Sequence, residues 1–548
     1  MVLLKEILFG RFTVWVGSMF LSVLFLGLTL SSSAWFLAPS IMFVAFTGLG
    51  LRDFAKKTHP VRANYPLMGR IRYLLESVRP ELRQYFWESD TDETPYSRNQ
   101  RAMVYQRSKD NQAKRSFGTE RNVYEEDYNW LNHSMLPIKI NDSDFRVKVG
   151  DPEKSQYLMS LLNISGMSFG ALSPPAVEAL SLGAHLGGFA QNTGEGSLSK
   201  YHQRGGGDLI WQISTGYFGC RTQSGEFSEE MFAEKACLEQ VKMIEIKLSQ
   251  GAKPGHGGLL PAPKVTQEIA EARGIPINQT CESPPSHSAF STPIELLKFA
   301  ERLRQLSGGK PVGVKLCIGH PWEFIALVKA MVETTQYVDF VTVDGSEGGT
   351  GAAPTEFSDN IGSPLRDSVV FVDNALRGAG LRKRVKVGAS GKIVSAYDIL
   401  RVCALGADWC NMARPFMFSL GCIQAKDCGS GHCPTGITTM DPLRYRALDV
   451  PSRGVRVRNF HHHTLGAVAE LLGAAGIEHP DHLNRRHIVR RLSGSQIKLA
   501  DQIYPKASDG VLITGNGVLE DPRLRNYWSV VSIDSFSLPD DHTRLDPS

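Results

Sequence analysis

Three cysteines stand close together in the second half of the sequence. Cys422, Cys428 and Cys433 fall within twelve residues, in a glycine-containing stretch that Pro434 follows at once. Zinc sites usually have CxxC pairs and four ligands, whereas a cubane that lacks one iron needs only three thiolates. The spacing therefore favours an iron-sulfur cluster over zinc. The alternative is three free or partly paired cysteines in a loop.

Eight short apolar runs alternate with amphipathic stretches from about Tyr157 onward. Such alternation is typical of repeated βα units, and eight of them predict an α/β fold, the (β/α)8 TIM barrel. The predicted strands are 158–164, 187–191, 208–213, 241–248, 311–316, 338–343, 385–388 and 407–412. The alternative, a doubly wound sheet, normally has fewer strands and a glycine-rich first turn.

Polar residues follow several of these strands, where a barrel opens onto its site. Ser390-Gly391 and Ala413-Arg414 come after the seventh and eighth strands, where barrels commonly bind phosphate through backbone N–H groups. Lys315 ends the fifth strand, a position at which lysines are usually functional. Its alternative role is pairing with a carboxylate of the core.

The longest loop of the predicted barrel, 251–310, carries further candidates. Gln250 precedes it, Lys253 lies within it, and Arg273 ends a predicted helix at 266–273. An amide and two cations could bind both carboxylates of a small dicarboxylic keto acid. On its own, Arg273 would more often be a solvated helix residue.

Six motifs, in this order, resemble those of the glutamate synthase family in its FMN-binding and iron-sulfur synthase domain. They are Gly166-Met-Ser-Phe-Gly-Ala-Leu-Ser173, Asn192-Thr-Gly-Glu-Gly196, Gln250-Gly-Ala-Lys-Pro-Gly255, Val314-Lys-Leu316, the segment 344–354 and the segment 421–436. Six ordered motifs over about 270 residues are hard to reach by chance. The resemblance implies FMN and a 3Fe-4S cluster, with the three clustered cysteines as the cluster ligands.

The resemblance also implies a role for individual residues. Glu195, Lys253 and Lys315 would be catalytic, and Gln250, Lys253 and Arg273 would bind 2-oxoglutarate. FMN would be bound by Ser168, Gly170, Asn192, Lys315, Asp344, Gly349, Ser390, Gly391, Ala413 and Arg414. A cation at Lys315 can stabilise the anionic reduced flavin. Glu195 could deliver a proton, or it could be a capping or ion-paired residue.

The activity that the resemblance implies is the reductive amination of 2-oxoglutarate to L-glutamate. Full-length members begin with a glutaminase domain, whereas this sequence begins with an apolar segment, so we expect ammonia or another amine from outside. Ferredoxin, an NAD(P)H-oxidising subunit or a membrane carrier would supply electrons. The alternatives are an N-methylglutamate synthase-like enzyme and a membrane electron-transfer subunit. His256 departs from the family motif, which more usually has glutamate there, and so changes the local hydrogen bonding.

The N-terminal segment predicts a membrane hairpin. No charged residue stands between Arg11 and Arg52, a span of about 40 residues, while one transmembrane helix needs about 20. Helices are predicted at 14–30 and 35–50, with Trp15 and Trp35 as interface anchors. Lys5 and Arg11 before the run, and Arg52, Lys56, Lys57 and Arg62 after it, predict that both ends and the catalytic bulk are cytoplasmic. A cleaved signal peptide fits less well, because the stretch is too long.

Composition narrows the class of protein further. The 548 residues are 42% hydrophobic and 21% charged, with a net charge of +4, which gives no reason to expect nucleic acid as a partner. Nine cysteines, none before Cys220, fit a reducing compartment rather than a disulfide framework. We expect four parts: a hairpin at 1–56, a connector packing on the barrel at 57–150, the barrel at 151–440, and a helical extension at 441–548 whose polar end, from about Asp509, is poorly ordered.

Overall fold

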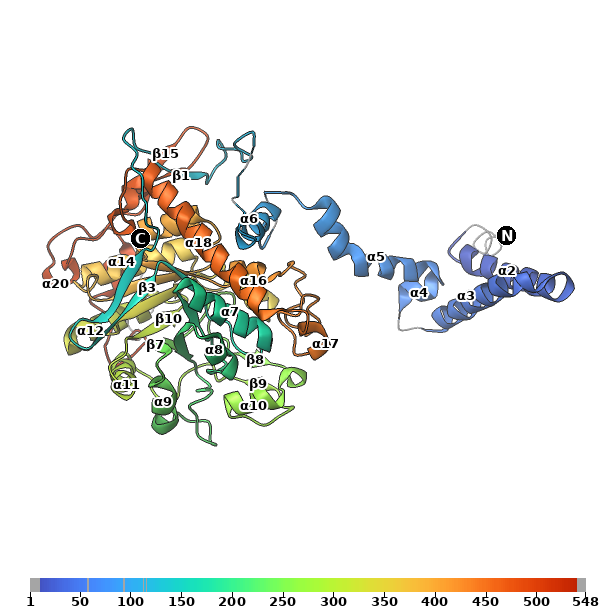
Figure 1. Cartoon of the computed structure of the whole chain (residues 1–548), viewed down its shortest axis with the longest axis horizontal. Coiled ribbons are helices and arrows are strands. Elements are labelled where there is room, and N and C mark those ends of the chain that lie inside the picture. Colours follow the sequence, from blue (N-terminus) through green and yellow to red (C-terminus); the bar gives the residue numbers. More distant parts are fainter. Residues whose placement is uncertain (1–9, 57–58, 92–93, 112, 115, 540–548) are drawn as a thin grey trace. The chain divides into compact units, whose positions relative to one another are not determined.

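The computed structural model describes residues 10–56, 59–91, 94–111, 113–114 and 116–539. The chain divides into two compact units, Met1–Thr94 and Pro95–Ser548 (Figure 1). This division falls inside the segment 57–150 that the sequence suggested as a connector. Lys5 and Lys57, two of the predicted flanking charges, and the last nine residues of the polar tail lie outside the described residues.

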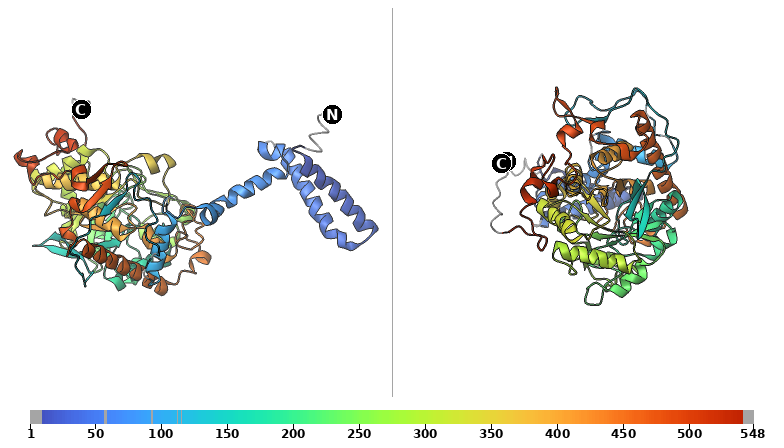
Figure 2. Two further views of the ribbon diagram at one scale, coloured as in Figure 1. Left: turned by 90° about the horizontal axis from the view of Figure 1, so that it is seen from above. Right: turned by 90° about the vertical axis from the view of Figure 1, so that its left-hand side faces the viewer.

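The first unit begins with two apolar helices, α2 (Thr13–Ser31) and α3 (Leu37–Ala55), joined by a 3₁₀ turn, Ala34–Phe36. They pack side by side as an antiparallel pair (Figure 2). The Trp15 indole N–H donates to the Thr47 carbonyl at 3.1 Å, and a Cβ at Gly50 would lie 2.1 Å from the Trp15 ring. Trp15 therefore packs between the helices, whereas Trp35 is 89% exposed.

Two further helices follow in the described part of this unit, α4 (Pro60–Asn64) and α5 (Met68–Leu82). Arg70 on α5 donates two hydrogen bonds to the Asp53 carboxylate, at 2.6 and 2.7 Å. Because Asp53 is buried near the end of α3, this bidentate pair fixes α5 to the base of the hairpin.

A closed barrel of eight parallel strands forms the second unit, in the order β10-β11-β12-β13-β4-β5-β6-β7. Its strands are β4 (Leu162–Ile164), β5 (Ala190–Asn192), β6 (Asp208–Ile213), β7 (Val241–Lys247), β10 (Val312–Leu316), β11 (Phe340–Asp344), β12 (Lys386–Ser390) and β13 (Trp409–Met412). Each overlaps one predicted run, so the (β/α)8 prediction is confirmed. Strands buried on both faces read as continuous apolar runs, which explains why the sequence revealed them.

The first predicted strand, 158–164, is wrong in extent because the strand is interrupted at Leu161. Its first half belongs to β3 (Ser155–Ser160), which pairs antiparallel with β2 (Arg146–Asp151). The Leu161 N–H donates to the Phe145 carbonyl, and the Leu161 carbonyl accepts from the Cys410 N–H of the barrel. Leu161 therefore joins the β2–β3 hairpin to the barrel. The β2–β3 hairpin covers the amino end of the barrel, where Val149 and Met159 pack with Phe340 and Trp409.

Helices surround the barrel and connect its strands. They include α7 (Pro174–Gly187), α8 (Lys200–Gly205), α9 (Glu229–Ala236), α11 (Pro293–Leu306), α12 (Pro321–Thr334), α14 (Leu365–Gly378), α15 (Ala396–Leu405) and α16 (Arg414–Leu420). The long loop 251–310 contains a short strand pair, β8 (Leu259–Leu260) with β9 (Cys281–Glu282), and α10 (Gln267–Arg273), close to the predicted helix.

The C-terminal extension packs against the barrel. Its helix α18 (Val450–Ala474) lies along α7 and α16 (Figure 1). Beyond it, β14 (Ile488–Arg491) pairs with β1 (Asn129–Leu131) and β15 (Ile497–Leu499). The end expected to be poorly ordered is folded as far as residue 539: Leu524 and Val531 are buried, and Lys329 donates to the Val531 carbonyl at 3.0 Å.

Candidate active site

A cavity of about 150 Å³ opens at the carboxyl ends of the barrel strands. Many of the predicted site residues line it, although they come from loops spread over 250 residues of sequence: Ser168, Glu195, Gln250, Lys253, Arg273, Lys315, Gly349, Ala413, Arg414 and Cys428. Lys247 and Lys264, which the sequence did not single out, line it as well. The wall is strongly cationic, and Glu195 supplies its carboxylate.

Glu195 forms an ion pair with Lys247, the last residue of β7. Lys247 Nζ lies 2.9 Å from Glu195 Oε2, and both side chains are mostly buried. Burial by itself raises the pKa of Glu195, but Lys247, Arg273 and Lys253 together lower it to about 2. Glu195 is therefore ionised at neutral pH. In this state it holds Lys247 in place and is not itself a proton donor.

Lys253 lies at the same wall and is 4% exposed. Its ammonium donates to the Gly257 carbonyl at 3.2 Å. Burial lowers the pKa of Lys253, although the Glu195 charge opposes this. A Cβ at Gly258 would come within 2.4 Å of Glu195 Oε1, so only glycine lets the loop pass this close to the carboxylate.

Arg273 reaches the cavity from α10 and is 4% exposed, which excludes the solvated alternative. Its Nη2 donates to the Phe169 carbonyl at 3.0 Å, and the guanidinium lies over the Phe218 ring. Among the described residues, its buried Nε has no hydrogen-bond partner. A cation with an unused donor at a cavity wall is suited to binding an anion.

Lys315 and Asp344 pair at the ends of β10 and β11, with Nζ 3.3 Å from Oδ2. Burial lowers the pKa of Lys315, but the charges of Asp344 and Glu245 outweigh this effect and raise the pKa above its ordinary value. Lys315 therefore pairs with a core carboxylate, which was the alternative to a functional role, and it also lines the cavity. Asp344 also accepts a hydrogen bond from the Gly251 amide at 3.0 Å.

A polar network lies inside the barrel beneath the cavity. The Glu245 carboxylate accepts hydrogen bonds from Asn192, Gln212 and Thr342, each at 2.7 Å. Asn192 also accepts from the Gly194 amide, which precedes Glu195. Asn192 thus supports the floor of the cavity without lining it. The sequence predicted Asn192 as a cofactor-binding residue but missed Glu245, which stands inside a buried strand.

Three other predicted cofactor residues lie behind the cavity walls. Ser390 Oγ is 3.2 Å from Ser165 Oγ. Gly391 follows with φ +144, which lets the chain turn sharply after β12. A Cβ at Gly170 would lie 3.3 Å from an Arg273 nitrogen. These residues shape the site through the backbone, and they do not line the cavity themselves.

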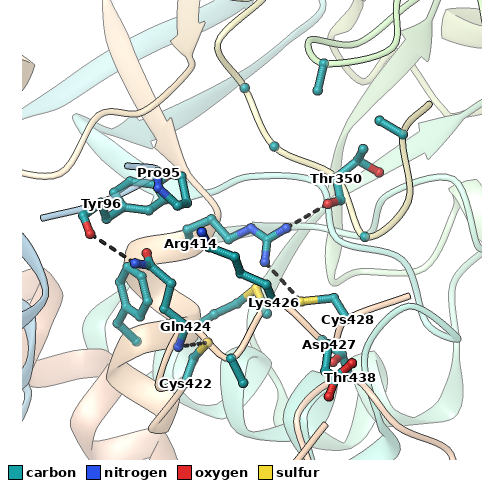
Figure 3. Close-up of a pocket in the computed structure, with 18 of the residues that line it drawn as sticks. Pro95, Tyr96, Thr350, Arg414, Cys422, Gln424, Lys426, Asp427, Cys428 and Thr438 are labelled. Carbon is teal, nitrogen blue, oxygen red and sulfur yellow. Dashed lines mark hydrogen bonds between the residues drawn. The ribbon is translucent and has the colours of Figure 1, made fainter. Parts of the chain in front are cut away.

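A second cavity, of about 430 Å³, adjoins the first and shares Gly349, Arg414 and Cys428 with it. All three clustered cysteines line this cavity. Figure 3 shows Arg414 at its centre, donating to Cys428 Sγ at 3.3 Å and to the Thr350 carbonyl at 2.8 Å. The guanidinium therefore joins the cysteine loop to the glycine-rich loop after β11.

The cysteine loop is fixed to the rest of the unit on several sides. The side-chain amide of Gln424 donates to the carbonyl of the buried Tyr96, and the backbone N–H of Gln424 donates to Cys422 Sγ (Figure 3). Lys264, 7% exposed, donates from the long loop to the carbonyls of Cys428 and Thr438, at 2.8 and 3.3 Å. These contacts hold the three thiols around one cavity.

The three clustered thiols differ in their surroundings. In the described part of the chain, no three His, Cys, Asp or Glu side chains gather closely enough to hold one metal ion. Burial raises the pKa of Cys433, but hydrogen bonds with Thr435 and Thr438 outweigh this effect and lower the pKa below its ordinary value. At Cys422, burial raises the pKa to about 11. Arg414 and Lys264 supply positive charge beside the thiols.

The adjoining cavities also suit a flavin. Gly166, Gly194 and Gly349 line the first cavity. Small residues of this kind leave room for a flat ring close to the backbone. Lys315 and Arg414 place cations at the same wall.

His256 does not line either cavity. Its exposed ring donates from Nδ1 to the Gly257 carbonyl at 2.9 Å and lies edge-on to Phe357. Lys253 donates to the same carbonyl, so His256 acts on the site through the backbone of the glycine pair.

A closed parallel barrel with paired cations and three thiols at its carboxyl end defines a barrel oxidoreductase. The family model described as the conserved region in glutamate synthase matches residues 96–478, and the chain belongs to the glutamate synthase family. It is 38% identical over 508 residues to the glutamate synthase large subunit-like protein YerD of Bacillus subtilis, covering 85% of this chain and 96% of that protein.

A second relative is more distant. The archaeal glutamate synthase [NADPH] of Methanocaldococcus jannaschii is 35% identical over 352 residues, 64% of this chain and 65% of that protein. The chain thus spans just under two thirds of this relative. Among solved structures, a mandelate oxidase with 3,3-difluoro-2-hydroxy-3-phenylpropionic acid matches with a TM-score of 0.40 and 15% identity, covering 68% of this chain and 87% of that one. This score supports no conclusion about function.

Proposed function

We propose that this enzyme catalyses the reductive amination of 2-oxoglutarate to L-glutamate. The observation that carries the proposal is the convergence of Lys247, Lys253 and Arg273 on one cavity wall around a single ionised Glu195. A wall with this excess of positive charge suits a dicarboxylate. Membership of the glutamate synthase family and the activity in the name of the archaeal relative agree with it.

The residues of the wall have distinct tasks in this proposal. Arg273, through its unused Nε, and Gln250 bind the substrate carboxylates, while Lys253 positions the keto group. Glu195 keeps Lys247 oriented, so that its ammonium can donate a proton to the oxygen that leaves as water. Bound FMN would supply the hydride, and a 3Fe-4S cluster at Cys422, Cys428 and Cys433 would feed it electrons.

The nitrogen and electron donors are part of the proposal. Ammonia, or another amine, would reach the cavity from solution or from a partner protein. Ferredoxin or an NAD(P)H-oxidising subunit would reduce the cluster. The M. jannaschii relative has NADPH in its name, which favours a pyridine nucleotide as the ultimate source.

We also propose that α2 and α3 cross the cytoplasmic membrane as a hairpin, with the barrel in the cytoplasm. Each helix has 19 residues, which at 1.5 Å per residue is close to the thickness of a bilayer core. Outward-facing side chains support this, since Phe20 is 69% exposed and Val23 73%. Basic residues after α3 favour the cytoplasm for that end.

The cofactor proposal is tested by purifying the full chain in detergent and recording anaerobic absorption and EPR spectra. We expect a flavin spectrum and an oxidised three-iron signal, and 2-oxoglutarate with ammonia should reoxidise the reduced flavin. Absence of both spectra would overturn the cofactors, and no reoxidation would overturn the reaction. Cys428→Ser should remove the EPR signal while the flavin stays bound.

Substrate binding is tested by Arg273→Ala. We expect kcat/KM for 2-oxoglutarate to fall by about 10- to 100-fold, because a hydrogen bond to a charged group contributes about 1.5–3 kcal/mol. Arg204→Ala, at an exposed residue of α8, is the matched control and should change nothing. If Arg273→Ala and Lys253→Ala leave function intact while Cys428→Ser abolishes it, the chain is an electron-transfer subunit instead.

An alkylamine is a second candidate for the nitrogen donor. Part of the first cavity wall is apolar, formed by Met167, Leu172, Leu259 and Leu260. Such a wall could accommodate a methyl group beside the cations. Comparing kcat/KM for methylamine and for ammonia decides between the two, and a preference for methylamine would make the product N-methylglutamate.

Membrane topology is tested with Ser32→Cys at the turn of the hairpin. In intact cells, a membrane-impermeant maleimide should label this cysteine from outside, while Cys237, the exposed native cysteine of the barrel unit, stays protected. Labelling of both, or of neither until the cells are opened, would exclude the proposed orientation.

A further inference from the structure

A third cavity, of about 310 Å³, lies at the opposite end of the barrel from the candidate active site. It opens beside the amino ends of β12 and β13, between α14, α15 and the C-terminal extension. Its charged lining residues are Asp373, Arg377, Arg382, Lys383, Lys386, Asp408, Asp481, Arg485 and Lys506. Its volume falls within the range of about 300–1,000 Å³ that is usual for small-molecule sites.

Positive charge dominates this cavity, with six cationic side chains against three carboxylates. Asp373 is shared by three guanidinium groups, since Arg382 and Arg485 lie 2.8 and 2.9 Å from it and Arg377 lies 3.5 Å away. Asp408 pairs with Arg382 as well, at 2.9 Å. The acidic residues therefore balance only part of the charge that surrounds them.

Some donors at this cavity are unused within the described part of the chain. The buried Nε of Arg377 has no hydrogen-bond partner. The ammonium groups of Lys383 and Lys506 form no ion pair with a described residue. Burial, together with the positive charge of Arg377 and Arg485, lowers the pKa of Lys506. A bound anion would relieve this repulsion and complete the hydrogen bonding of the arginines.

We propose that this cavity binds a small anion with more than one phosphate group, such as pyrophosphate or the diphosphate of a nucleotide. Arginine presents planar pairs of donors that match phosphate oxygens, and lysine adds point charges at the rim. A single phosphate would leave most of a 310 Å³ cavity unused, whereas a diphosphate fills more of it and offers oxygens to both the arginines and the lysines of its lining.

The bound anion would join two parts of the unit. Arg377, Arg382 and Lys383 belong to α14 and the loop before β12, whereas Arg485 and Lys506 belong to the C-terminal extension. A ligand that contacts both parts binds only while they are packed together. Binding therefore stabilises the folded unit, without touching the residues of the candidate active site.

The test uses the full chain in detergent and sodium pyrophosphate as the probe, with sodium chloride and citrate at matched ionic strength. We expect pyrophosphate to raise the Tm and to bind in calorimetry, with chloride inert and citrate at least tenfold weaker. Absence of pyrophosphate binding would overturn the proposal, and citrate binding of equal strength would overturn the phosphate class.

Variants locate the binding. The double variant Lys383→Gln with Lys506→Gln should weaken pyrophosphate binding at least tenfold and leave the flavin content unchanged. The control, Lys139→Gln with Lys298→Gln, removes two exposed lysines elsewhere and should bind as the wild type does. Equal binding by both double variants would place the anion elsewhere and reject this cavity as its site.

Discussion

The two ends of the barrel hold their charges in different ways. At the carboxyl end, Lys247 pairs with Glu195 and Lys315 with Asp344. At the amino end, three arginines depend on the single carboxylate of Asp373. Both ends carry more cations than carboxylates, but the carboxyl end holds two of its lysines in one-to-one pairs, whereas the amino end shares one carboxylate among three arginines. An end of the barrel that usually serves stability thus also offers a binding site.

The strongest test of this contrast removes the shared carboxylate. Asp373→Asn leaves three mostly buried guanidinium groups without their common partner, and we expect a loss of about 4 kcal/mol in the free energy of unfolding. Urea unfolding measures it. Asp509→Asn, at an exposed second partner of Arg377, should cost about 0.5 kcal/mol. Similar costs for the two variants would show that Asp373 is not the centre of the cluster.

A smaller loss is expected when a matched pair is broken. Lys247→Met removes the hydrogen-bonded partner of the Glu195 carboxylate and leaves only the charges of Arg273 and Lys253 to compensate it, so we expect about 3 kcal/mol of destabilisation together with loss of turnover. Lys242→Met is the matched control on the same strand, because its pair with Asp208 is partly exposed and 3.7 Å long. Adding Glu195→Gln to Lys247→Met should restore most of the stability. Failure of this rescue would contradict the pairing.

Acid stability depends on two buried histidines of helices outside the barrel, His202 of α8 and His461 of α18. Burial lowers the pKa of His202 and of His461 to about 3. Below pH 6.5 the unfolded chain takes up these protons and the folded chain does not, so stability falls as the pH falls. The fall should approach about 1.4 kcal/mol per pH unit for each histidine. The pKa of Glu195, about 2, excludes it from this window.

Urea unfolding at pH 7.5, 6.5 and 5.5 measures this dependence. His202→Asn should reduce the slope by the share of one histidine, whereas the exposed His432→Asn should leave it unchanged. An unchanged slope in His202→Asn would mean that the ring is protonated in the folded state.

The smallest effect is expected at a surface pair near the cavity. Lys200 and Glu268 lie 2.5 Å apart but are 51% and 40% exposed. Lys200→Ala should therefore cost only about 0.5 kcal/mol, as measured by urea unfolding. A cost above about 2 kcal/mol would show that exposed and buried pairs do not differ here as the contrast requires.

The sequence predicted the barrel because its strands are continuous apolar runs, and it predicted Lys315 because a lysine ends one of them. Lys247 ends another strand in the same way, so the same reasoning would have predicted it as a site residue. Lys264 had no local signal, since its role depends on carbonyls more than 160 residues away. The break at Leu161 was hidden because apolar residues continue on both sides of it.

The amino-end cavity lay beyond prediction for a different reason. Its arginines come from α14, the following loop and the C-terminal extension, and Asp373 and Arg485 are 112 residues apart. Each reads as an ordinary charged residue in its own segment. Only the folded topology brings them together around Asp373.

The contact of Lys264 couples the two loops that form the site. Its ammonium connects the loop that carries Lys253 and Arg273 to the loop that carries the cysteines. A change that moves the Cys428 and Thr438 carbonyls is therefore transmitted to the loop of Lys253 and Arg273, and a change in that loop is transmitted to the cysteines.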